Sequence, residues 1–276
     1  MIKIFARTIY VSGLLLPLIW ACSNEPAGDV QQGALPVGQG AAFRVVADSV
    51  SMSSPSCSEG GNRCALFSAV YPVVEPDSVS AHRQINDTLS LYVRNALSGI
   101  SPSAAPSQQS LEEMGKAFLA EYDTAMADMT DFPQQWAAEL SYEVMLEDSA
   151  VITFALQTYM FTGGAHPNSF ATLASFDKLT GERLRLEDFV KDLIAFTDIA
   201  ESGFREAREL PAGADLNAEG FFWGEGYFLP ENIVLVEEGV HLHYNAYEAA
   251  PYAAGPTAYT IPFAQLSGLL KKRAKQ

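Results

Sequence analysis

The chain has 276 residues, with 33 acidic and 17 basic side chains, a formal net charge of −16 and a sequence pI near 4.5. Apolar residues make up 48% and charged residues 18%, which excludes a disordered polar chain or a protein with many membrane spans. The acidity argues against non-specific nucleic-acid binding, which depends on clustered Lys and Arg. The length allows one large domain or two modest ones.

The N-terminus has the pattern of an export signal. Lys3 and Arg7 precede an apolar run from Ile9 to Trp20, which is shorter than the roughly 20 apolar residues of a membrane span. Ala21-Cys22 then resembles a bacterial lipobox, in which the chain is cleaved before the cysteine and the cysteine becomes the acylated N-terminus, typically with palmitate among the acyl chains. An ordinary cleaved signal peptide with a chance cysteine is the alternative.

We therefore expect a signal peptide over residues 1–21, lipidation of Cys22 and a flexible Gly/Pro/Gln-rich tether over residues 22–40. In Gram-negative bacteria, an Asp directly after the lipidated cysteine retains a lipoprotein in the inner membrane. This chain has Ser23 at that position, which by resemblance to those rules favours the cell outer membrane and its periplasmic face. Cleavage would remove two positive charges and change the net charge from −16 to −18. Such a charge attracts basic partners, although plain solubility is the interpretation we favour for the charge itself.

The other two cysteines, Cys57 and Cys64, flank a Gly-Gly turn. In an oxidising compartment they are expected to form a disulfide, and closing a loop of this size contributes about 2.5 kcal/mol in the chain-entropy description. A zinc site would need two more nearby Cys or His side chains, so the sequence predicts no metal there.

The N-terminal half of the folded part predicts two strands followed by two helices. Pro72 and Pro76 are expected to end the second strand. Ser110 and Glu113 have the spacing of a capping box. The expected elements are strands at 43–50 and 63–71, a helix at 77–97, a loop at 98–109 and a helix from Leu111 to Met126.

The C-terminal half changes to a period of two, which is typical of strands. Strands at 136–146 and 151–161 predict a long hairpin. Beyond it we expect a strand at 169–176, a turn at 177–181, a helix at 188–209, a hairpin of 233–236 and 240–245, a strand at 258–261 and a helix at 263–270. Helices and strands come in separate groups, so the sequence predicts an α+β fold of antiparallel sheets with packed helices and two subdomains.

Histidines are the first candidates for chemistry. His166, in Gly163-Gly164-Ala165-His166, is a weak candidate for a general base, and fixing the turn is the other interpretation. His241 and His243 would share one face of a strand, yet two histidines do not complete a zinc shell. His82 is expected at a helix surface or an edge.

Aromatic side chains are the second kind of candidate. Tyr247, Pro251 and Tyr252 lie around a turn rich in small residues, and aromatic rings anchor both binding sites and cores. The segment from Phe221 to Trp223, with Tyr227 and Phe228, leaves the same two interpretations open: core, or a lip for stacking on glycan.

Several motifs together resemble the paired extracytoplasmic domains of unknown function that form the lysozyme-sensing ectodomain of the sigma-V anti-sigma factor and accompany a peptidoglycan N-deacetylase. They are Tyr71-Pro72, Ile85-Asn86, Phe161 to Asn168, Asp177 to Gly181, Leu184 to Asp188, Tyr247 to Gly255, and Ile261 to Phe263. The resemblance implies a deacetylase-accessory-like domain at 41–168 and an anti-sigma-ectodomain-like domain at 169–276. The metal-binding carboxylate and histidines of a deacetylase are not found, so it implies fold and envelope location without an activity.

From these observations we expect a bacterial envelope lipoprotein with no cofactor, held at the membrane by its lipid. Its expected role is non-catalytic binding of a basic protein such as lysozyme, or of peptidoglycan, with Tyr247, Pro251, Tyr252 and His166 as contact residues. The alternative is a cell-wall enzyme centred on His166.

Overall fold

The computed structural model describes residues 42–59, 63–98, 109–128 and 134–271. The expected signal peptide, Cys22 and the tether lie outside these residues. No helix within the described ranges is both long and apolar enough to cross a membrane.

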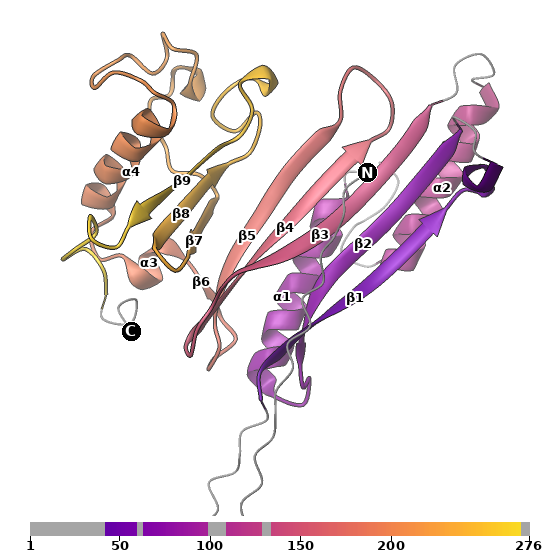
Figure 1. The fold of residues 1–276 in the computed structure, drawn as a ribbon, viewed down its shortest axis with the longest axis horizontal. Coiled ribbons are helices and arrows are strands. Elements are labelled where there is room, and N and C mark those ends of the chain that lie inside the picture. Colours follow the sequence, from indigo (N-terminus) through magenta and orange to yellow (C-terminus); the bar gives the residue numbers. More distant parts are fainter. Residues whose placement is uncertain (1–41, 60–62, 99–108, 129–133, 272–276) are drawn as a thin grey trace, which may run out of the picture. The chain divides into compact units, whose positions relative to one another are not determined.

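The described residues fold into a six-stranded and a three-stranded sheet (Figure 1). The first sheet and its helices are β1 (Arg44–Ser53), η1 (Pro55–Glu59), β2 (Cys64–Glu75), α1 (Ser80–Leu97), α2 (Leu111–Asp128), β3 (Gln135–Glu147), β4 (Val151–Phe161), β5 (Asn168–Asp177) and β6 (Arg183–Leu184). The remainder is α3 (Leu186–Phe189), α4 (Leu193–Ala207), η3 (Phe222–Gly224), β7 (Asn232–Leu235), β8 (Gly239–Tyr244), η4 (Tyr252–Ala254) and β9 (Thr257–Pro262). The predicted α+β class is confirmed.

The strands of the first sheet follow chain order, β1 to β6. All neighbours are antiparallel except β2 and β3, which pair in parallel from Cys64↔Gln135 to Ala69↔Leu140. A parallel pair needs a long crossover, and the chain from α1 to α2 supplies it. The sheet is therefore mixed, where the sequence pattern predicted antiparallel pairing throughout.

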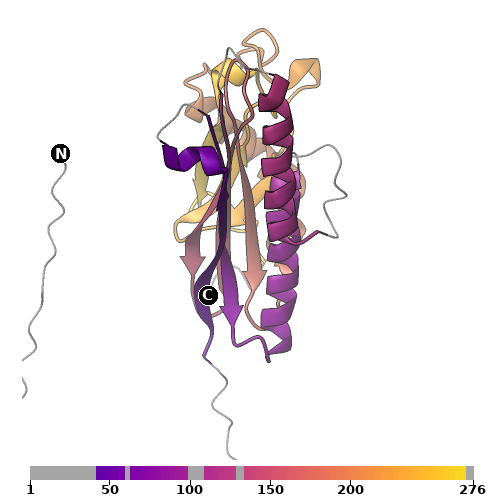
Figure 2. The ribbon, with the colours of Figure 1, turned by 90° about the vertical axis from the view of Figure 1, so that its right-hand side faces the viewer.

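Helices α1 and α2 pack on one face of this sheet (Figure 2). Helix α2 places Met114, Phe118 and Tyr122 in the core at one-turn spacing, against Phe67 of β2. The predicted capping box is present, because the Glu113 amide donates to Ser110 Oγ at 3.2 Å and the Ser110 amide donates to Glu113 Oε2 at 2.8 Å. The helix therefore begins where the sequence predicts.

Pro72 does not end β2, contrary to the prediction. The pairing of β2 with β3 stops at Ala69, so β2 has a free edge beyond that point. The amide of Val74, two residues on, points to that edge and donates to Asn86 Oδ1 at 2.8 Å. Since alternate amides of a strand point to the same side, the missing N–H of Pro72 would also face this free edge, where proline is tolerated.

The predicted disulfide joins Cys57 of η1 to Cys64 at the start of β2, with 4.6 Å between their Cα atoms. His82, expected at a surface, is instead 5% exposed. Its Nδ1 lies 3.0 Å from the Pro76 carbonyl oxygen, and its ring packs edge-on against Phe43. A histidine on the inner side of α1 is buried because its polar atom finds a backbone partner.

The three strands of the second sheet run antiparallel in the order β7-β8-β9, so the predicted hairpin and following strand are confirmed. Helix α4 lies against β9 and buries Phe196, Ala200 and Phe204.

The predicted helix at 188–209 is wrong at its start. Val190 has extended backbone angles (φ −107°, ψ 137°) and forms a β-bridge with Leu270. The Lys191 amide donates to the Leu269 carbonyl at 2.8 Å. The break between α3 and α4 therefore arises from pairing with the C-terminal segment.

The predicted terminal helix at 263–270 is also wrong. The segment forms successive turns with bonds three residues apart, such as Leu266 N–H to the Phe263 carbonyl at 3.1 Å. Gly268 has φ +90°, which an α-helix does not contain. Leu266 and Leu270 are nonetheless buried, so apolar spacing identified the inward side chains but not the backbone.

Candidate functional site

Two turns that are about 85 residues apart in the chain meet beside the start of β5. The Tyr252 hydroxyl donates to the Pro167 carbonyl at 2.9 Å. The His166 ring stacks on the Tyr252 ring, with ring centroids 3.8 Å apart and an angle of 14° between the planes. The Tyr247 and Tyr252 ring centroids are 5.6 Å apart, with an angle of 36° between the planes. We call His166, Pro167, Tyr247, Pro251 and Tyr252 the aromatic turn cluster; it contains all four residues that the sequence put forward for ligand binding.

The aromatic turn cluster is accessible to solvent. His166 and Pro251 are exposed, Tyr252 is half-buried, and Tyr247 is 54% exposed. The turn before His166 depends on Gly163 and Gly164, with φ of +88° and +100°, angles that glycine adopts without steric cost. The rings of Tyr247 and Tyr252 therefore do not lie in a buried core, which was the other interpretation left open by the sequence.

Arg208 forms hydrogen bonds with the segment between β8 and β9 that contains Tyr247, Pro251 and Tyr252, which we call the Tyr/Pro turn. Its Nε donates to Thr257 Oγ1 at 2.7 Å, and its two terminal nitrogens donate to the carbonyls of Ala254 and Gly255 at 3.0 and 3.1 Å. Burial lowers the pKa of this guanidinium. A single charged side chain thus fixes several carbonyls of this turn.

The contacts of His166 favour a structural role over proton transfer. Its Nδ1 lies 2.9 Å from the Pro167 carbonyl oxygen, and one ring face is covered by Tyr252. Within the described residues, its ring makes no hydrogen bond with a hydroxyl or a carboxylate. A general base acts on a positioned nucleophile or water, and no such protein partner is placed here.

Two asparagines from the second sheet bind the edge of β5. The Ala171 amide donates to Asn245 Oδ1 at 2.7 Å, and Asn245 Nδ2 donates back to the Ala171 carbonyl at 3.0 Å. The Leu173 amide donates to Asn232 Oδ1 at 2.8 Å, and Asn232 is only 6% exposed. This asparagine junction covers the unpaired edge of β5 next to the aromatic turn cluster.

Glu248 ties the junction to the Tyr/Pro turn. Its carboxylate accepts from the amides of Asn245 at 2.8 Å and Glu231 at 2.9 Å. Burial raises the pKa of Glu248, and the two backbone hydrogen bonds oppose that shift.

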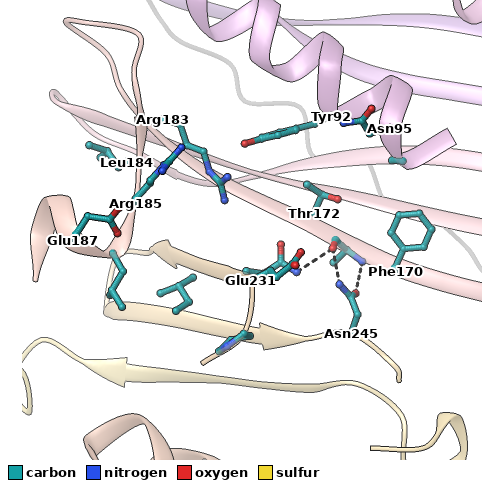
Figure 3. A pocket seen from close by; sticks show the side chains of 16 residues that line it. Tyr92, Asn95, Phe170, Thr172, Arg183, Leu184, Arg185, Glu187, Glu231 and Asn245 are labelled. Carbon is teal, nitrogen blue, oxygen red and sulfur yellow. Dashed lines mark hydrogen bonds between the residues drawn. The ribbon is translucent and has the colours of Figure 1, made fainter. Parts of the chain in front are cut away.

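A pocket of about 680 Å³ opens beside the asparagine junction (Figure 3). Its walls come from the end of α1, from β5, from β6 with the start of α3, and from β7. On one wall, the Arg183 guanidinium lies 5.4 Å from the centre of the Tyr92 ring. We call it the β5–β7 pocket. Phe170, Ala171 and Asn245 line it, so it adjoins the aromatic turn cluster.

The β5–β7 pocket was not predicted from the sequence, because its walls come from elements far apart in the chain. Two signals were present: basic residues at 183 and 185 in a very acidic chain, and asparagines at both ends of a predicted hairpin.

His241 and His243 do not line either region. Burial lowers the pKa of both, and the charge of His243 lowers that of His241 further. His241 Nδ1 lies 3.0 Å from Thr260 Oγ1. Across the described ranges, no group of three or more His, Cys, Asp or Glu side chains is placed to hold a metal ion.

The aromatic side chains between Phe221 and Phe228 lie mainly in the core. Phe221, Phe222, Phe228 and Tyr227 pack around Phe204 and Tyr244, whereas Trp223 is 55% exposed.

Comparison with known proteins divides the chain into two. Residues 58–169 match a family model described as Deacetylase PdaC, and residues 187–264 match one described as a protein of unknown function, DUF3298. No curated protein matches the chain.

Two solved structures share the fold of nearly the whole chain. A DUF3298-family protein from Bacteroides fragilis is 19% identical with a TM-score of 0.63, covering 84% of this chain and 95% of its own. A DUF3298-family protein from Pseudomonas aeruginosa is 20% identical with a TM-score of 0.57, covering 85% and 97%. Sheet pairing continues past the boundary at residue 168 that the sequence suggested, since β5 and β6 complete the first sheet.

Proposed function

We propose that this chain, which pairs a PdaC-type domain with a DUF3298-type domain, is a non-catalytic binding module of the bacterial cell envelope. Its proposed partner is a basic protein of the lysozyme type, contacted by the aromatic turn cluster. The observation that carries the proposal is the stacked, solvent-accessible arrangement of His166, Tyr252 and Tyr247.

Aromatic side chains suit such a contact because they bury a large area and lose few rotamers. Here the turn that carries them is ordered before binding by the Tyr252–Pro167 hydrogen bond and by the hydrogen bonds from Arg208 to the carbonyls of Ala254 and Gly255. A surface that is already ordered loses less entropy when a partner docks.

The charge of the whole chain supports a basic partner over an acidic one. A net charge of −16 attracts a basic protein over a range set by salt and raises its association rate. Glycan strands of peptidoglycan would use the same rings without this attraction, so salt dependence separates the two ligands.

The experiment is a binding titration of purified protein with lysozyme and, separately, with soluble peptidoglycan strands. We expect lysozyme affinity to fall steeply between about 50 and about 500 mM salt. Tyr247→Ala should weaken lysozyme binding by about tenfold or more, as loss of an aromatic anchor does. Leu179→Ala is the control, because Leu179 is 82% exposed and lies in the turn at the other end of β5.

Equal affinity of Tyr247→Ala and Leu179→Ala would overturn the proposed contact. Binding of glycan without binding of lysozyme would overturn the proposed partner. The enzyme alternative would replace the binding module if the protein hydrolysed the glycan strands or their acetyl groups, and if His166→Ala lost this activity while keeping its fold.

The same proposal places the module at the periplasmic face of the outer membrane, held by acylated Cys22. In a mass spectrum the mature protein should begin at an acylated Cys22, and an unmodified Cys22 with the leader uncut would contradict the anchor.

A further inference from the structure

The β5–β7 pocket carries charged side chains that the proposed partner contact does not use. Arg183 lies in β6, and Arg185 follows it just before α3. Glu231 directly precedes β7, and Glu187 lies in α3. Figure 3 shows the Arg183 side chain extending beside Tyr92 into the pocket, with the Glu231 carboxylate on the other side.

The charged side chains of the pocket do not form ion pairs with one another. Among the described residues, the ion pairs within 4.0 Å are Arg44–Glu75, Lys178–Glu147 and Arg205–Glu201, so neither pocket arginine is neutralised by a carboxylate of that part of the chain. The aromatic ring of Tyr92 holds the Arg183 guanidinium in place and leaves its N–H donors available. Guanidinium groups bind carboxylates through paired hydrogen bonds.

The charge of the chain restricts the class of ligand. A simple anion approaching a body of net charge −16 is repelled over distances of a Debye length. A zwitterion carries no net charge and meets no such barrier, while each of its ends finds an opposite charge inside the pocket. The two arginines and the two glutamates also cancel formally, which matches a ligand of zero net charge.

We infer that the β5–β7 pocket binds a small zwitterion of the amino-acid or short-peptide class. Its carboxylate lies at Arg183 and Arg185, and its ammonium group lies at Glu231. The pocket volume of about 680 Å³ is within the usual range for small-molecule sites. Thr172 and Asn95 supply neutral hydrogen-bonding groups for an amide between the two ends.

The test uses the full chain and three probes: the dipeptide alanyl-alanine, acetate and inorganic phosphate, each titrated while amide NMR shifts are followed. We expect saturable shifts around the pocket with the dipeptide and at least about tenfold weaker binding of acetate and phosphate, since each lacks one charged contact. Arg183→Gln should weaken the dipeptide by about tenfold. Arg83→Gln is the control, because it removes the same charge from an exposed site on α1.

Glu231→Gln separates the two ends of the ligand. It should weaken the dipeptide and leave acetate affinity unchanged within about twofold. The inference is overturned if the dipeptide gives no saturable shifts, if phosphate or acetate binds as tightly, or if Arg183→Gln behaves as Arg83→Gln does. Because these variants lie outside the aromatic turn cluster, their lysozyme affinity should stay at the parent value, so failure here is distinguishable from failure of the proposed partner contact.

Discussion

Asn232 and Asn245 bind the edge of β5 as a neighbouring strand would, although they do so with side-chain amides. An exposed strand edge invites pairing with other chains, and the asparagine junction occupies the donors and acceptor at Ala171 and Leu173. A side-chain amide offers both a donor and an acceptor, so one residue can satisfy two backbone groups. The junction thus protects the edge and positions both candidate binding regions.

Asn232→Ala should destabilise the protein by about 1–3 kcal/mol, because the Leu173 amide would be left buried without its acceptor. Urea unfolding measures the loss, and hydrogen exchange should show faster exchange at Leu173. Asn95→Ala, at an exposed position on α1, is the control. Equal stability of the two variants would show that the junction contributes nothing.

Local elements followed their sequence patterns where the cause was local. The capping box at Ser110 and the apolar spacing of α2 predicted that helix. The alternation over residues 136–146, followed by a second strand at 151–161, predicted the β3–β4 hairpin. Elements that depend on distant partners did not. The break at Val190 requires the bridge to Leu270, and the strand at Pro72 continues because β3 has already left that edge. Periodicity contains no information on either contact.

Ser110→Ala should cost about 1 kcal/mol, since the Glu113 amide loses its cap. The loss should appear in the free energy of unfolding and as fraying of the first turn of α2 in hydrogen exchange. Ser51→Ala, at an exposed position of β1, provides the control. A cap loss no larger than that of the control would mean that tertiary packing alone fixes the start of α2.

Over the whole molecule, the sequence pointed to four of the five residues of the aromatic turn cluster, all except Pro167, but not to the contact between them. Their contact depends on the Tyr252–Pro167 hydrogen bond, which joins the two sheets' turns. The β5–β7 pocket could not be predicted for the same reason, because its arginines, its tyrosine and its glutamate come from separate elements. The sequence shows which residue types are present, whereas the packing of the two sheets decides which of them lie together.

Stability should fall on mild acidification because of His241 and His243. Burial lowers the pKa of both in the folded state, so the unfolded chain binds more protons below about pH 6.5. This contribution is present above that pH and is lost as the pH falls through the lower folded pKa values.

Urea unfolding at about pH 7.5 and about pH 5.5 measures the histidine contribution. The double variant His241→Gln/His243→Gln should show a smaller loss of stability on acidification than the parent. An identical loss in both would contradict the assignment. Glu248, whose pKa burial raises, acts in the opposite sense: its contribution is present below its unfolded pKa and is lost as the pH rises through the folded value.

We propose that the two turns form one surface for a basic envelope partner. Amide chemical-shift mapping of the full chain with lysozyme at low salt measures this contact residue by residue. We expect shifts concentrated at residues 163–168 and 245–256, and we expect high salt to remove them. Shifts on the open face of the first sheet instead, or no shifts at either turn, would contradict it.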